Sequence, residues 1–366
     1  MAASPEEEAL AQGGAERVAT IESPVGVGDR ELTEDALMGE GRDSCSRDSA
    51  THGMAEARWP AVSVVVPVLD GAPHLRQCLD AIAGQRYDGR LEVIVVDGGS
   101  EDATVELAAE RPGVTVLHNP RRSRPAGMNV GLRAARGEIV VRVDVRTVIE
   151  EDYVRRCVET LARSSAAIVG GPMRLVAGTP GERGIAEAMS SKLGGGTARF
   201  RRQSPEPGPV DTVYLGAYRK SVVLSLGGYD ESFGGNEDAE LAWRLRAAGG
   251  AYLDPSIRST YSVRGSLAEL FGQYFRYGTA RARTLRKHPD SISPRQLAVP
   301  ALLLGIASPW RRYVLGCYGT ALVARTARLA RRDLRAAPSF LVAIPLMHAG
   351  WAVGLLRGLA ARPRRG

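Results

Sequence analysis

Acidic residues that follow apolar runs are the part of this sequence whose types and spacing could do chemistry. Asp70, Asp97 and Asp144 each come after a β-branched run, and Glu237–Asp238 opens a helical pattern behind two glycines. A single Asp after a strand is often only a turn or N-cap residue, because its short side chain accepts backbone N–H groups. Four such positions aimed at one crevice are poorly explained as caps, and they indicate a binding and catalytic site.

The chemistry that suits this set is transfer of a sugar from a nucleotide diphosphate donor. Such a donor needs a carboxylate that accepts from its base or ribose, a carboxylate-held divalent cation, and cationic side chains around its phosphates. Transfer of the sugar to an alcohol also needs a general base near the incoming hydroxyl. Asp97, Asp144 and Asp238 suit these three tasks in that order, and arginine is plentiful.

Alternating strands and helices are predicted to position these residues. The predicted strands lie at 62–66, 91–96, 114–117 and 139–143, and the predicted helices at 73–83, 102–110 and 126–135. This alternation predicts a parallel α/β sheet with right-handed crossovers, in which ligands bind beyond the carboxyl ends of the strands. Further along, the pattern predicts a strand at 211–215 and helices at 237–248 and 266–287.

The charge of the chain is unevenly distributed, although 48 Lys and Arg against 41 Asp and Glu give a net charge of only +7. Residues 1–58 hold 13 acidic and 5 basic residues (−8), 59–257 hold 25 and 24 (−1), and 258–366 hold 3 and 19 (+16). A basic end indicates nucleic acid or an anionic membrane surface as a partner. Because its arginines are interleaved with long apolar blocks and not with exposed aromatic residues, we predict a membrane and no nucleic acid.

Composition excludes several classes of protein. An apolar content of 44% is too high for a chain that is disordered throughout. The four cysteines lie far apart without a CxxC pair, which excludes a disulfide scaffold and a zinc knuckle and suits a reducing compartment. Residues 1–58 lack sustained apolar periodicity and the pattern of a signal peptide, so we predict a disordered acidic tail there.

Three uncharged apolar blocks follow one another near the C-terminus, at 297–308, 313–324 and 338–356. Spanning a bilayer takes about 20 apolar residues, so only the third block is long enough by itself. The first two blocks suit a re-entrant pair or one broken span. A soluble helical subdomain is the alternative, and the sequence favours association with a membrane.

Seven short motifs follow one another in order along the chain. They are Val64–Pro67 with Asp70, Val95–Thr104, Pro125–Gly131, Ala135–Glu138 leading into Asp144, Gly227–Phe233, Asn236–Leu241 and Gln273–Tyr277. In this order they resemble the inverting glycosyltransferases of family 2, which have the GT-A fold. Within that family the chain is most similar to the membrane-associated bacterial enzymes of succinoglycan-type exopolysaccharide assembly.

The resemblance implies a role for each matching residue. It implies a nucleotide-sugar site in which Asp97 contacts the base, uracil in many members, and which consists of Pro67, Asp70, Asp97, Gly98, Ser100, Asn129, Asp144 and Arg146. It implies that Asp238 is the catalytic base with Glu237 beside it. It also implies that Gln273, Arg276 and Tyr277 lie near the acceptor and the diphosphate.

Two positions depart from the family pattern. The usual Asp-x-Asp motif is Asp144-Val145-Arg146 here, so a cation replaces the second carboxylate. Either Asp144 holds Mg²⁺ or Mn²⁺ together with water and phosphate, or Arg146 partly replaces the charge of the metal. A solvent-facing Arg146 is the third possibility. The second departure is Asp70-Gly71, where the family usually has Asn-Glu, and it weakens the role implied for Asp70.

We therefore predict an α/β chain in four parts: an acidic tail (1–58), a GT-A catalytic domain (59–263), an amphipathic interfacial helix on the acceptor side (264–295) and membrane-associated apolar, Arg-rich helices (296–366). As the resemblance implies, it is an inverting, hexosyltransferase-type enzyme that uses a UDP-sugar and a glycan or lipid-linked acceptor, at the inner membrane with its catalytic domain facing the cytoplasm. The alternatives are a catalytically impaired nucleotide-sugar-binding protein of the same fold and a sugar-nucleotide nucleotidyltransferase. The latter normally has a Gly-rich basic loop after its first strand, unlike Val68–Pro73.

Overall fold

The computed structural model describes residues 59–195, 198–202, 204–292 and 294–361. The chain separates into a unit that ends at Met54 and a second unit from Ala55 onward. The predicted acidic tail therefore lies outside the described residues, and the fold below is that of the second unit.

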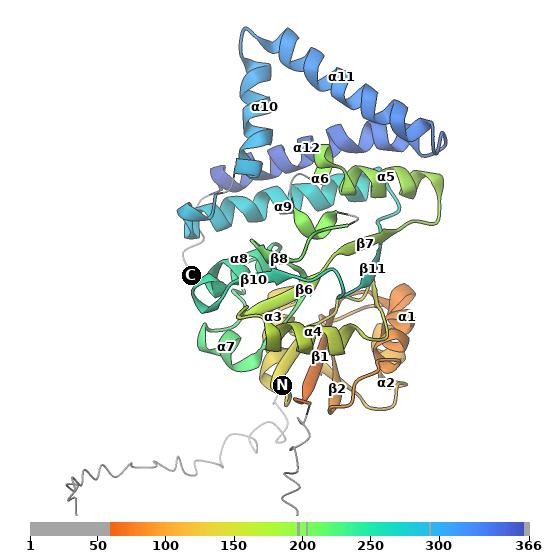
Figure 1. The fold of residues 1–366 in the computed structure, drawn as a ribbon, viewed down its shortest axis with the longest axis vertical. Coiled ribbons are helices and arrows are strands. Elements are labelled where there is room, and N and C mark those ends of the chain that lie inside the picture. The colour runs from red at the N-terminus through yellow and green to blue at the C-terminus, as the bar shows by residue number, and fades with distance from the viewer. Residues whose placement is uncertain (1–58, 196–197, 203, 293, 362–366) are drawn as a thin grey trace, which may run out of the picture. The chain divides into compact units, whose positions relative to one another are not determined.

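A mostly parallel sheet of eight strands is the centre of the fold (Figure 1). The strands lie in the order β3-β2-β1-β4-β9-β6-β10-β8, and β9 is antiparallel to both of its neighbours, as is β8 to β10. Their bounds are β1 Val62–Val68, β2 Leu91–Asp97, β3 Val114–His118, β4 Ile139–Arg142, β6 Ile168–Gly171, β8 Gly208–Val210, β9 Tyr214–Arg219 and β10 Ala251–Leu253.

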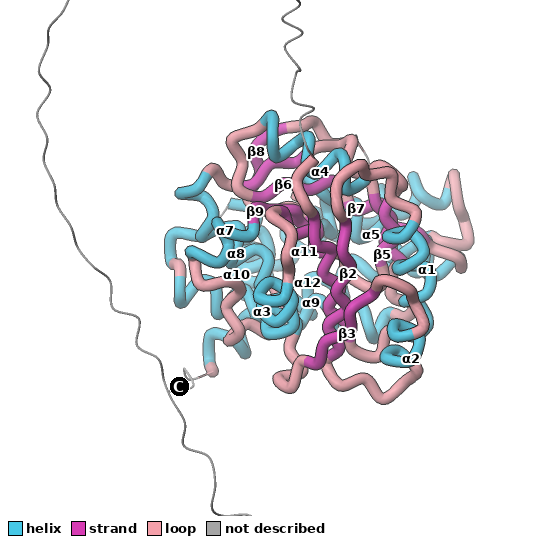
Figure 2. Tube along the Cα trace, turned by 90° about the horizontal axis from the view of Figure 1, so that it is seen from below, coloured by secondary structure: helices cyan, strands magenta, loops and turns pink. Residues whose placement is uncertain are grey.

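Helices cover both faces of this sheet, which is why its central strands are continuous β-branched runs. Helices α1 (Ala72–Ala83), α2 (Thr104–Ala109) and α4 (Tyr153–Arg163) share one apolar core with the strands. Helices α3 (Arg124–Ala134), α7 (Lys220–Ser225) and α8 (Glu237–Arg244) share a second core on the opposite face. Figure 2 shows α1 and α2 on one side of β2 and β3, and α3 on the other.

A small second sheet connects the main sheet to a helical layer. It consists of β5 (Thr147–Ile149), β11 (Ser259–Ser262) and β7 (Met173–Val176), with β11 in the middle. Beyond it lie α5 Pro180–Ser190, α6 Lys192–Gly195, α9 Leu267–Lys287, α10 Ala298–Ala307, α11 Arg311–Ala330 and α12 Ala337–Ala360. The short 3₁₀ helices are η1 Arg199–Arg201, η2 Leu245–Ala248, η3 Pro289–Ser291 and η4 Pro294–Leu297.

Close contact between α9 and α12 depends on glycine. A Cβ atom on Gly354 would lie 2.1 Å from the backbone oxygen of Phe275, and one on Gly278 would lie 2.0 Å from that of Trp351. Small residues thus let the two helix backbones approach each other, and α12 lies along α9 (Figure 1). Because α9 carries the Gln273–Tyr277 motif, this packing fixes the place of that motif.

The α10–α11 hairpin stands away from the sheet, on the far side of α12 (Figure 1). Several of its large apolar side chains are exposed, among them Leu304 at 73% and Val323 at 61%. Among the described residues, α12 is the one helix long and apolar enough to cross a membrane, and 44% of its most apolar window is buried within the protein. A helix this buried is weak evidence for a span, because the core helix of a soluble protein passes the same test.

The predicted alternation of strands and helices is confirmed, with shifts at the ends. Strand β1 continues through Pro67, which lies beyond Val65, the last residue paired with β4, so that its missing N–H disrupts no pairing on that side. The strand predicted at 211–215 is wrong: β9 begins only at Tyr214 and runs to Arg219. The helix predicted over 237–248 ends as an α-helix at Arg244, and its last turn is the 3₁₀ helix η2.

Candidate active site

The ends of β2, β1 and β4 lie side by side at one edge of the main sheet. Val68 of β1 is paired with Asp97 of β2, and Val65 of β1 with Arg142 of β4. The polar residues that follow these three strands therefore lie at the same edge, where parallel α/β sheets bind their ligands.

Asp97 is buried and anchors the loop that follows β2. Its carboxylate accepts the backbone N–H groups of Gly99 at 2.8 Å and Ser100 at 3.2 Å, and the hydroxyl of Ser100 at 2.5 Å. Gly99 has a φ of +81°, a conformation that L residues rarely adopt. The structure thus places Asp97, Gly98 and Ser100 in one rigid turn at the strand end.

The loop after β1 is bonded to this turn in both directions. The backbone N–H of Asp70 donates to the Ser100 hydroxyl, and an Asp70 carboxylate oxygen accepts the N–H of Glu101, both at 2.9 Å. Asp102 accepts the N–H of Ala72 at 3.0 Å. The two loops form one polar ledge, and the residues predicted to surround the nucleotide base all lie on it or, like Pro67, in the strand just before it.

A buried arginine connects two further predicted site residues. Arg142 is 3% exposed, and its guanidinium donates from Nε to Asp144 at 2.9 Å and from Nη2 at 3.3 Å, while Nη2 lies 3.2 Å from Glu237 Oε1. Arg124, from the first turn of α3, lies 3.3 Å from the same Glu237 oxygen. Residues from β4, α3 and α8 thus meet in one ion-paired cluster.

The charges in this cluster shift the pKa values of its carboxylates in different directions. Burial would raise the pKa of Asp144, but Arg142 and Arg124 outweigh it and hold that pKa below its usual range. The pKa of Glu237 is likewise lowered, because the same two arginines outweigh its burial. Asp238 differs: burial raises its pKa, and the negative charge of Glu237 raises it further.

Asp238 therefore has the properties of a general base. It opens α8, it is half-buried, and it accepts the backbone N–H of Ala239 at 2.9 Å. An acid whose pKa is shifted upward accepts a proton more readily than an ordinary Asp, and its ionised neighbour Glu237 stays charged. This is the pattern expected where two adjacent carboxylates have different roles.

No group of three or more His, Cys, Asp or Glu side chains suited to a metal occurs within the described ranges. Asp144 is one carboxylate, 25% exposed, with both oxygens oriented by Arg142. Arg146 donates to the backbone oxygens of Ser262 and Val263 at 3.4 and 3.2 Å, so its charge is fixed at the end of β11. These residues fit a cation that takes its remaining ligands from phosphate and water, and not one held by protein alone.

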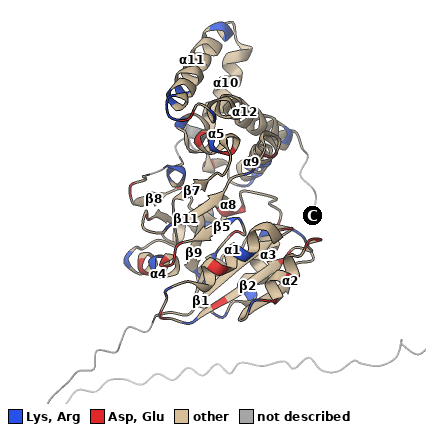
Figure 3. Ribbon diagram, turned by 90° about the vertical axis from the view of Figure 1, so that its right-hand side faces the viewer, with Lys and Arg blue, Asp and Glu red and all other residues tan. Residues whose placement is uncertain are grey.

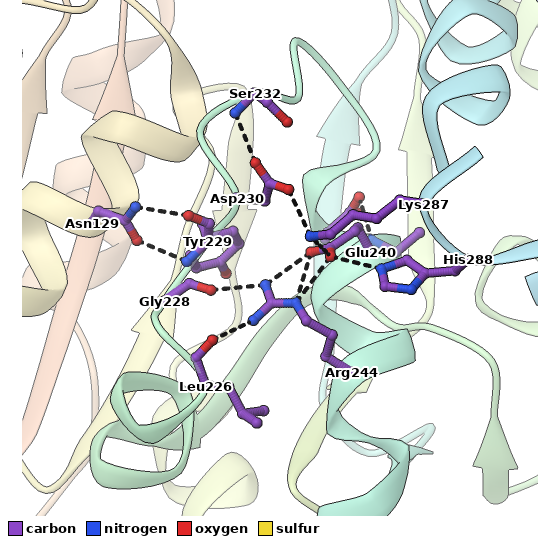
Figure 4. Close-up of polar contacts among 12 residues, drawn as sticks. Asn129, Leu226, Gly228, Tyr229, Asp230, Ser232, Glu240, Arg244, Lys287 and His288 are labelled. Carbon is purple, nitrogen blue, oxygen red and sulfur yellow. Dashed lines mark hydrogen bonds and ion pairs between the residues drawn. The ribbon is translucent and has the colours of Figure 1, made fainter. Parts of the chain in front are cut away.

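Asn129 holds the loop that leads into α8 (Figure 4). Its side-chain oxygen accepts the N–H of Tyr229, and its amide nitrogen donates to the Tyr229 backbone oxygen and to Glu231, all at 2.8 Å. Gly228 packs so closely that a Cβ atom would lie 2.5 Å from the Asn129 oxygen. Asn129, predicted to bind the nucleotide sugar, thus uses its amide to position the segment before Glu237 and Asp238.

Glu240 links the start of α8 to the end of α9 (Figure 4). It is fully buried and accepts from Arg244 at 2.8 Å, Lys287 at 2.7 Å and His288 at 3.0 Å. Lys287 also donates to Asp230 at 2.7 Å. One carboxylate with several cationic partners therefore fixes α8 against α9, and with it the two residues that open α8.

Comparisons with known proteins agree with this arrangement. Residues 63–227 match the model of a family described as Glycosyl transferase family 2. The chain is 32% identical over 322 residues to the succinoglycan biosynthesis protein ExoA of Rhizobium meliloti (strain 1021), covering 82% of this chain and 96% of the relative. The chain belongs to glycosyltransferase family 2.

Two further proteins are similar to the chain, one in sequence and one in structure. The glycosyltransferase is 27% identical over 306 residues to the pre-mycofactocin glycosyltransferase of Mycobacterium tuberculosis (strain CDC 1551 / Oshkosh), which covers 80% of this chain and 63% of that relative. It shares its fold with the mannosyltransferase PcManGT from Pyrobaculum calidifontis, solved with GDP-Man and Mn²⁺, at a TM-score of 0.54 and 22% identity over 83% and 88% of the two chains. The predicted GT-A fold is confirmed, and the nucleotidyltransferase alternative is not supported.

The predicted acceptor-side residues of the glycosyltransferase lie on α9. Gln273 is buried and donates to the Tyr277 hydroxyl at 2.9 Å, and Asn236 donates to the Tyr277 backbone oxygen at 3.3 Å. Arg276 is exposed on the same helix. Since Asn236 directly precedes Glu237, Gln273 and Tyr277 border the candidate catalytic pair.

The sequence analysis did not select Arg142 or Arg124, although these two arginines set the charge of the site. Arg142 did leave a signal, because it is a charged residue inside an otherwise apolar strand, Ile139–Val143. A buried strand keeps such a residue only when it is paired. Arg124 left no signal, since nothing in its own segment connects it to Glu237, 113 positions further along the chain.

Proposed function

We propose that this glycosyltransferase moves a sugar from a nucleotide diphosphate donor, a UDP-sugar, to a hydroxyl of a glycan or lipid-linked acceptor, with inversion at the anomeric carbon. The observation that carries the proposal is the geometry at the strand ends, where Arg142 and Arg124 join Asp144 and Glu237 in one ion-paired cluster and Asp238 lies next to Glu237 at the start of α8. The similarity to a succinoglycan biosynthesis protein supports a role in exopolysaccharide synthesis.

In the proposed mechanism the donor lies along the strand ends, with its base on the ledge of Asp70 and Asp97 and its diphosphate near Asp144. Asp238 removes the proton from the acceptor hydroxyl as that oxygen attacks the anomeric carbon. The bond to the diphosphate breaks on the opposite face, so a single displacement inverts the configuration. Arg124, whose side chain is half exposed, offsets negative charge on the leaving diphosphate.

A divalent cation, Mg²⁺ or Mn²⁺, would be bound by Asp144 and the donor phosphates, and it would supply positive charge for the leaving group. The relative solved with Mn²⁺ has the same fold, which supports a cation here. Removal of cations with EDTA should lower transfer, and added Mg²⁺ or Mn²⁺ should restore it. Full transfer in EDTA would instead assign the charge compensation to the arginines.

The C-terminal helices supply the proposed contact with the membrane. The α10–α11 hairpin exposes large apolar side chains, and α12 has the length of a span. We place the protein at the inner membrane with the catalytic domain on the cytoplasmic side, where activated sugars are made. The basic residues that follow the apolar part of α11 suit an anionic cytoplasmic leaflet.

The decisive experiment is Asp238→Asn in the full chain, assayed with a panel of nucleotide sugars in membranes that contain the protein. Loss of a positioned general base lowers the rate by about 10²–10⁴-fold, while donor binding should be retained. Asp290→Asn is the matched control, because Asp290 is 68% exposed and forms one surface ion pair. Wild-type turnover by Asp238→Asn would refute its role as the base, and a wild-type enzyme without any donor turnover would favour the catalytically impaired alternative.

The base-binding role of Asp97 is tested separately. Asp97→Ala should raise the KM for the donor, because it removes the anchor of the turn that borders the predicted base pocket. A donor KM equal to that of the wild type would count against this role. The Asp97 and Asp238 variants together separate donor binding from proton removal.

A further inference from the structure

A cavity of about 690 Å³ lies outside the site described above, between β7 and α5 on one side and α11 and the start of α12 on the other. This volume falls within the range of about 300–1,000 Å³ that is typical of ligand sites. Figure 3 shows basic residues at the end of α11 that lies beside α5. The cavity is thus a half-open groove between the small sheet and the helical layer, away from the nucleotide side of the fold.

The lining of this cavity is strongly cationic, with seven arginines against two carboxylates. Arg183 is paired with Asp333 at 2.6 Å. Four of the others have guanidinium groups without a hydrogen bond, ion pair or ring contact to any residue that the structure describes: Arg202, Arg325, Arg328 and Arg332. All four side chains are exposed, so their charges are accessible to an anion, and their summed positive field attracts one to the cavity.

Apolar groups beside these charges point to an amphiphile. Leu329 and Phe340 line the cavity, as does Val176, which is 50% exposed. The α10–α11 hairpin that ends at this cavity exposes further apolar side chains on the other faces of α11, Tyr313 at 55% and Val323 at 61%. A ligand with phosphate groups in the cavity and a hydrocarbon chain against Leu329, Val176 and the hairpin would use both kinds of surface.

The cavity is connected to the candidate catalytic pair through α9. Arg201, which lines the cavity, donates to the Tyr274 hydroxyl at 2.9 Å and lies 6.0 Å from the centre of the Tyr277 ring. The backbone oxygen of Tyr277 accepts from Asn236, the residue before Glu237. Arg201 and Asn236 thus contact the same turn of α9, which links the cavity to the residue that precedes the candidate catalytic pair.

From these observations we infer that the cavity binds the phosphate groups of a lipid-linked acceptor, a polyprenyl phosphate or diphosphate that carries the sugar to be extended. The arginines hold the phosphates, the apolar side chains beside the cavity and on the α10–α11 hairpin take the first part of the polyprenyl chain, and the sugar hydroxyl extends past Tyr277 toward Asp238. This inference rests on the proposed function, since it identifies the acceptor of the same reaction.

The test measures binding of the full chain to vesicles and needs no catalysis. One set of phosphatidylcholine vesicles carries undecaprenyl diphosphate, and a second carries the same charge as phosphatidylglycerol. The pocket variant replaces Arg325, Arg328 and Arg332 with Gln. The control variant replaces Arg311, Arg331 and Arg335 with Gln, which removes the same charge from exposed positions of the same region that do not line the cavity.

The wild type should prefer the undecaprenyl diphosphate vesicles, and the pocket variant should bind them about a hundredfold more weakly. The control variant should lose far less on these vesicles. Equal losses by both variants on both vesicles would overturn the inference, because they would show only general attraction to an anionic surface. Inorganic diphosphate that binds the wild type as tightly as the vesicles do would overturn the lipid source and assign the cavity to a soluble phosphate.

Donor hydrolysis without acceptor separates this inference from the proposed function. The pocket variant should retain wild-type hydrolysis, because the guanidinium groups of its three substituted arginines make no hydrogen bond or ion pair with the described residues, and this also shows that the variant is folded. If the wild type turns over no donor, with or without acceptor, while the pocket variant still loses vesicle binding, the proposed function fails and the phosphate site stands. A pocket variant that binds vesicles as the wild type does would refute the site, whatever the turnover.

Discussion

Removal of Arg142 should show how much the site depends on one buried cation. Arg142 lies 2.9 Å from Asp144 and 3.2 Å from Glu237, and neither the arginine nor Glu237 is more than 3% exposed. At an effective dielectric constant of about 20, each contact contributes about 5 kcal/mol of Coulomb attraction, part of which offsets the desolvation of the charges. Arg142→Met keeps most of the side-chain volume but leaves the half-exposed Arg124 to offset the charge of the two carboxylates.

The expected loss of stability follows from the buried carboxylates that remain without Arg142. Breaking a buried ion pair by removing one member destabilises a protein by about 3–5 kcal/mol. For a chain of this size that corresponds to a decrease in Tm of about 5–10 °C. Arg142→Lys is the matched control, because it retains the charge and loses only the forked geometry, so its Tm should decrease by less than half as much.

The pKa shifts also predict how the stability loss of Arg142→Met changes with pH. In the wild type the pKa values of Asp144 and Glu237 are lowered by Arg142, so their contribution to stability is present above the unfolded pKa and is lost as the pH falls through the folded pKa. In Arg142→Met the pKa values of both carboxylates should be higher than in the wild type, because Arg124 remains but Arg142 no longer lowers them, and their protonation in acid should reduce the repulsion. The difference in the free energy of unfolding between wild type and variant (the stability gap) should therefore be largest near neutral pH and should decrease toward about pH 4.

The assay is thermal unfolding of the full chain across this pH range, followed by intrinsic fluorescence. A gap below about 1 kcal/mol at neutral pH would refute the argument, because it would place the pair in the range of an exposed salt bridge. A gap that widens in acid would refute it as well, since it would mean that Arg142 does not act through these carboxylates.

Three further predictions concern Asp238, the α9–α12 contact and Glu240. The kcat of transfer should fall in acid at a pH above the ordinary Asp pKa of about 3.9, because burial and a negative neighbour raise the pKa of Asp238; a pH profile with its acid limb at the ordinary value would contradict this. Gly354→Leu should lower the Tm, because its Cβ would lie 2.1 Å from the Phe275 oxygen, whereas Gly316→Leu, with no atom within 4 Å, should be tolerated. Glu240→Gln should cost about 1–3 kcal/mol in urea unfolding, since it removes the fully buried carboxylate that accepts from Arg244, Lys287 and His288, and a loss below about 0.5 kcal/mol would argue against this.

The part of the sheet next to the proposed donor site could be predicted from sequence, because each of its strands and helices is recognisable from the pattern of its own residues. Strands β1, β2 and β4 are β-branched runs buried on both faces, and the helices between them have clear periodicity. Parallel topology then places the strand ends at one edge, so Asp97 and Asp144 could be brought together from sequence alone. Asp238 could be selected from its place at the start of a predicted helix and from the family motif, but its position beside the strand ends could not be predicted, because no strand leads into it.

The remaining features depend on contacts between distant segments, which a single sequence does not encode locally. Strand β9 lies antiparallel between β4 and β6, and nothing in 214–219 specifies that place. Strands such as β5 and β10 have three residues each, too few for a period to be visible. The arginine cavity combines residues near 174–202 with others near 325–340, so its charge is visible in the sequence only as part of a generally basic C-terminal region.

Helix α9 couples the two halves of the proposed reaction, and this makes the Gly354 variant informative beyond stability. One face of α9 packs on the glycines of α12, while its Tyr274 and Tyr277 lie between the arginine cavity and Asn236. The donor ledge after β1 and β2 has no part in that contact. If Gly354→Leu displaces α9 without unfolding the main sheet, transfer to a lipid-linked acceptor should be lost while donor hydrolysis persists. Equal loss of both activities would mean that α9 supports the whole site and does not position the acceptor alone.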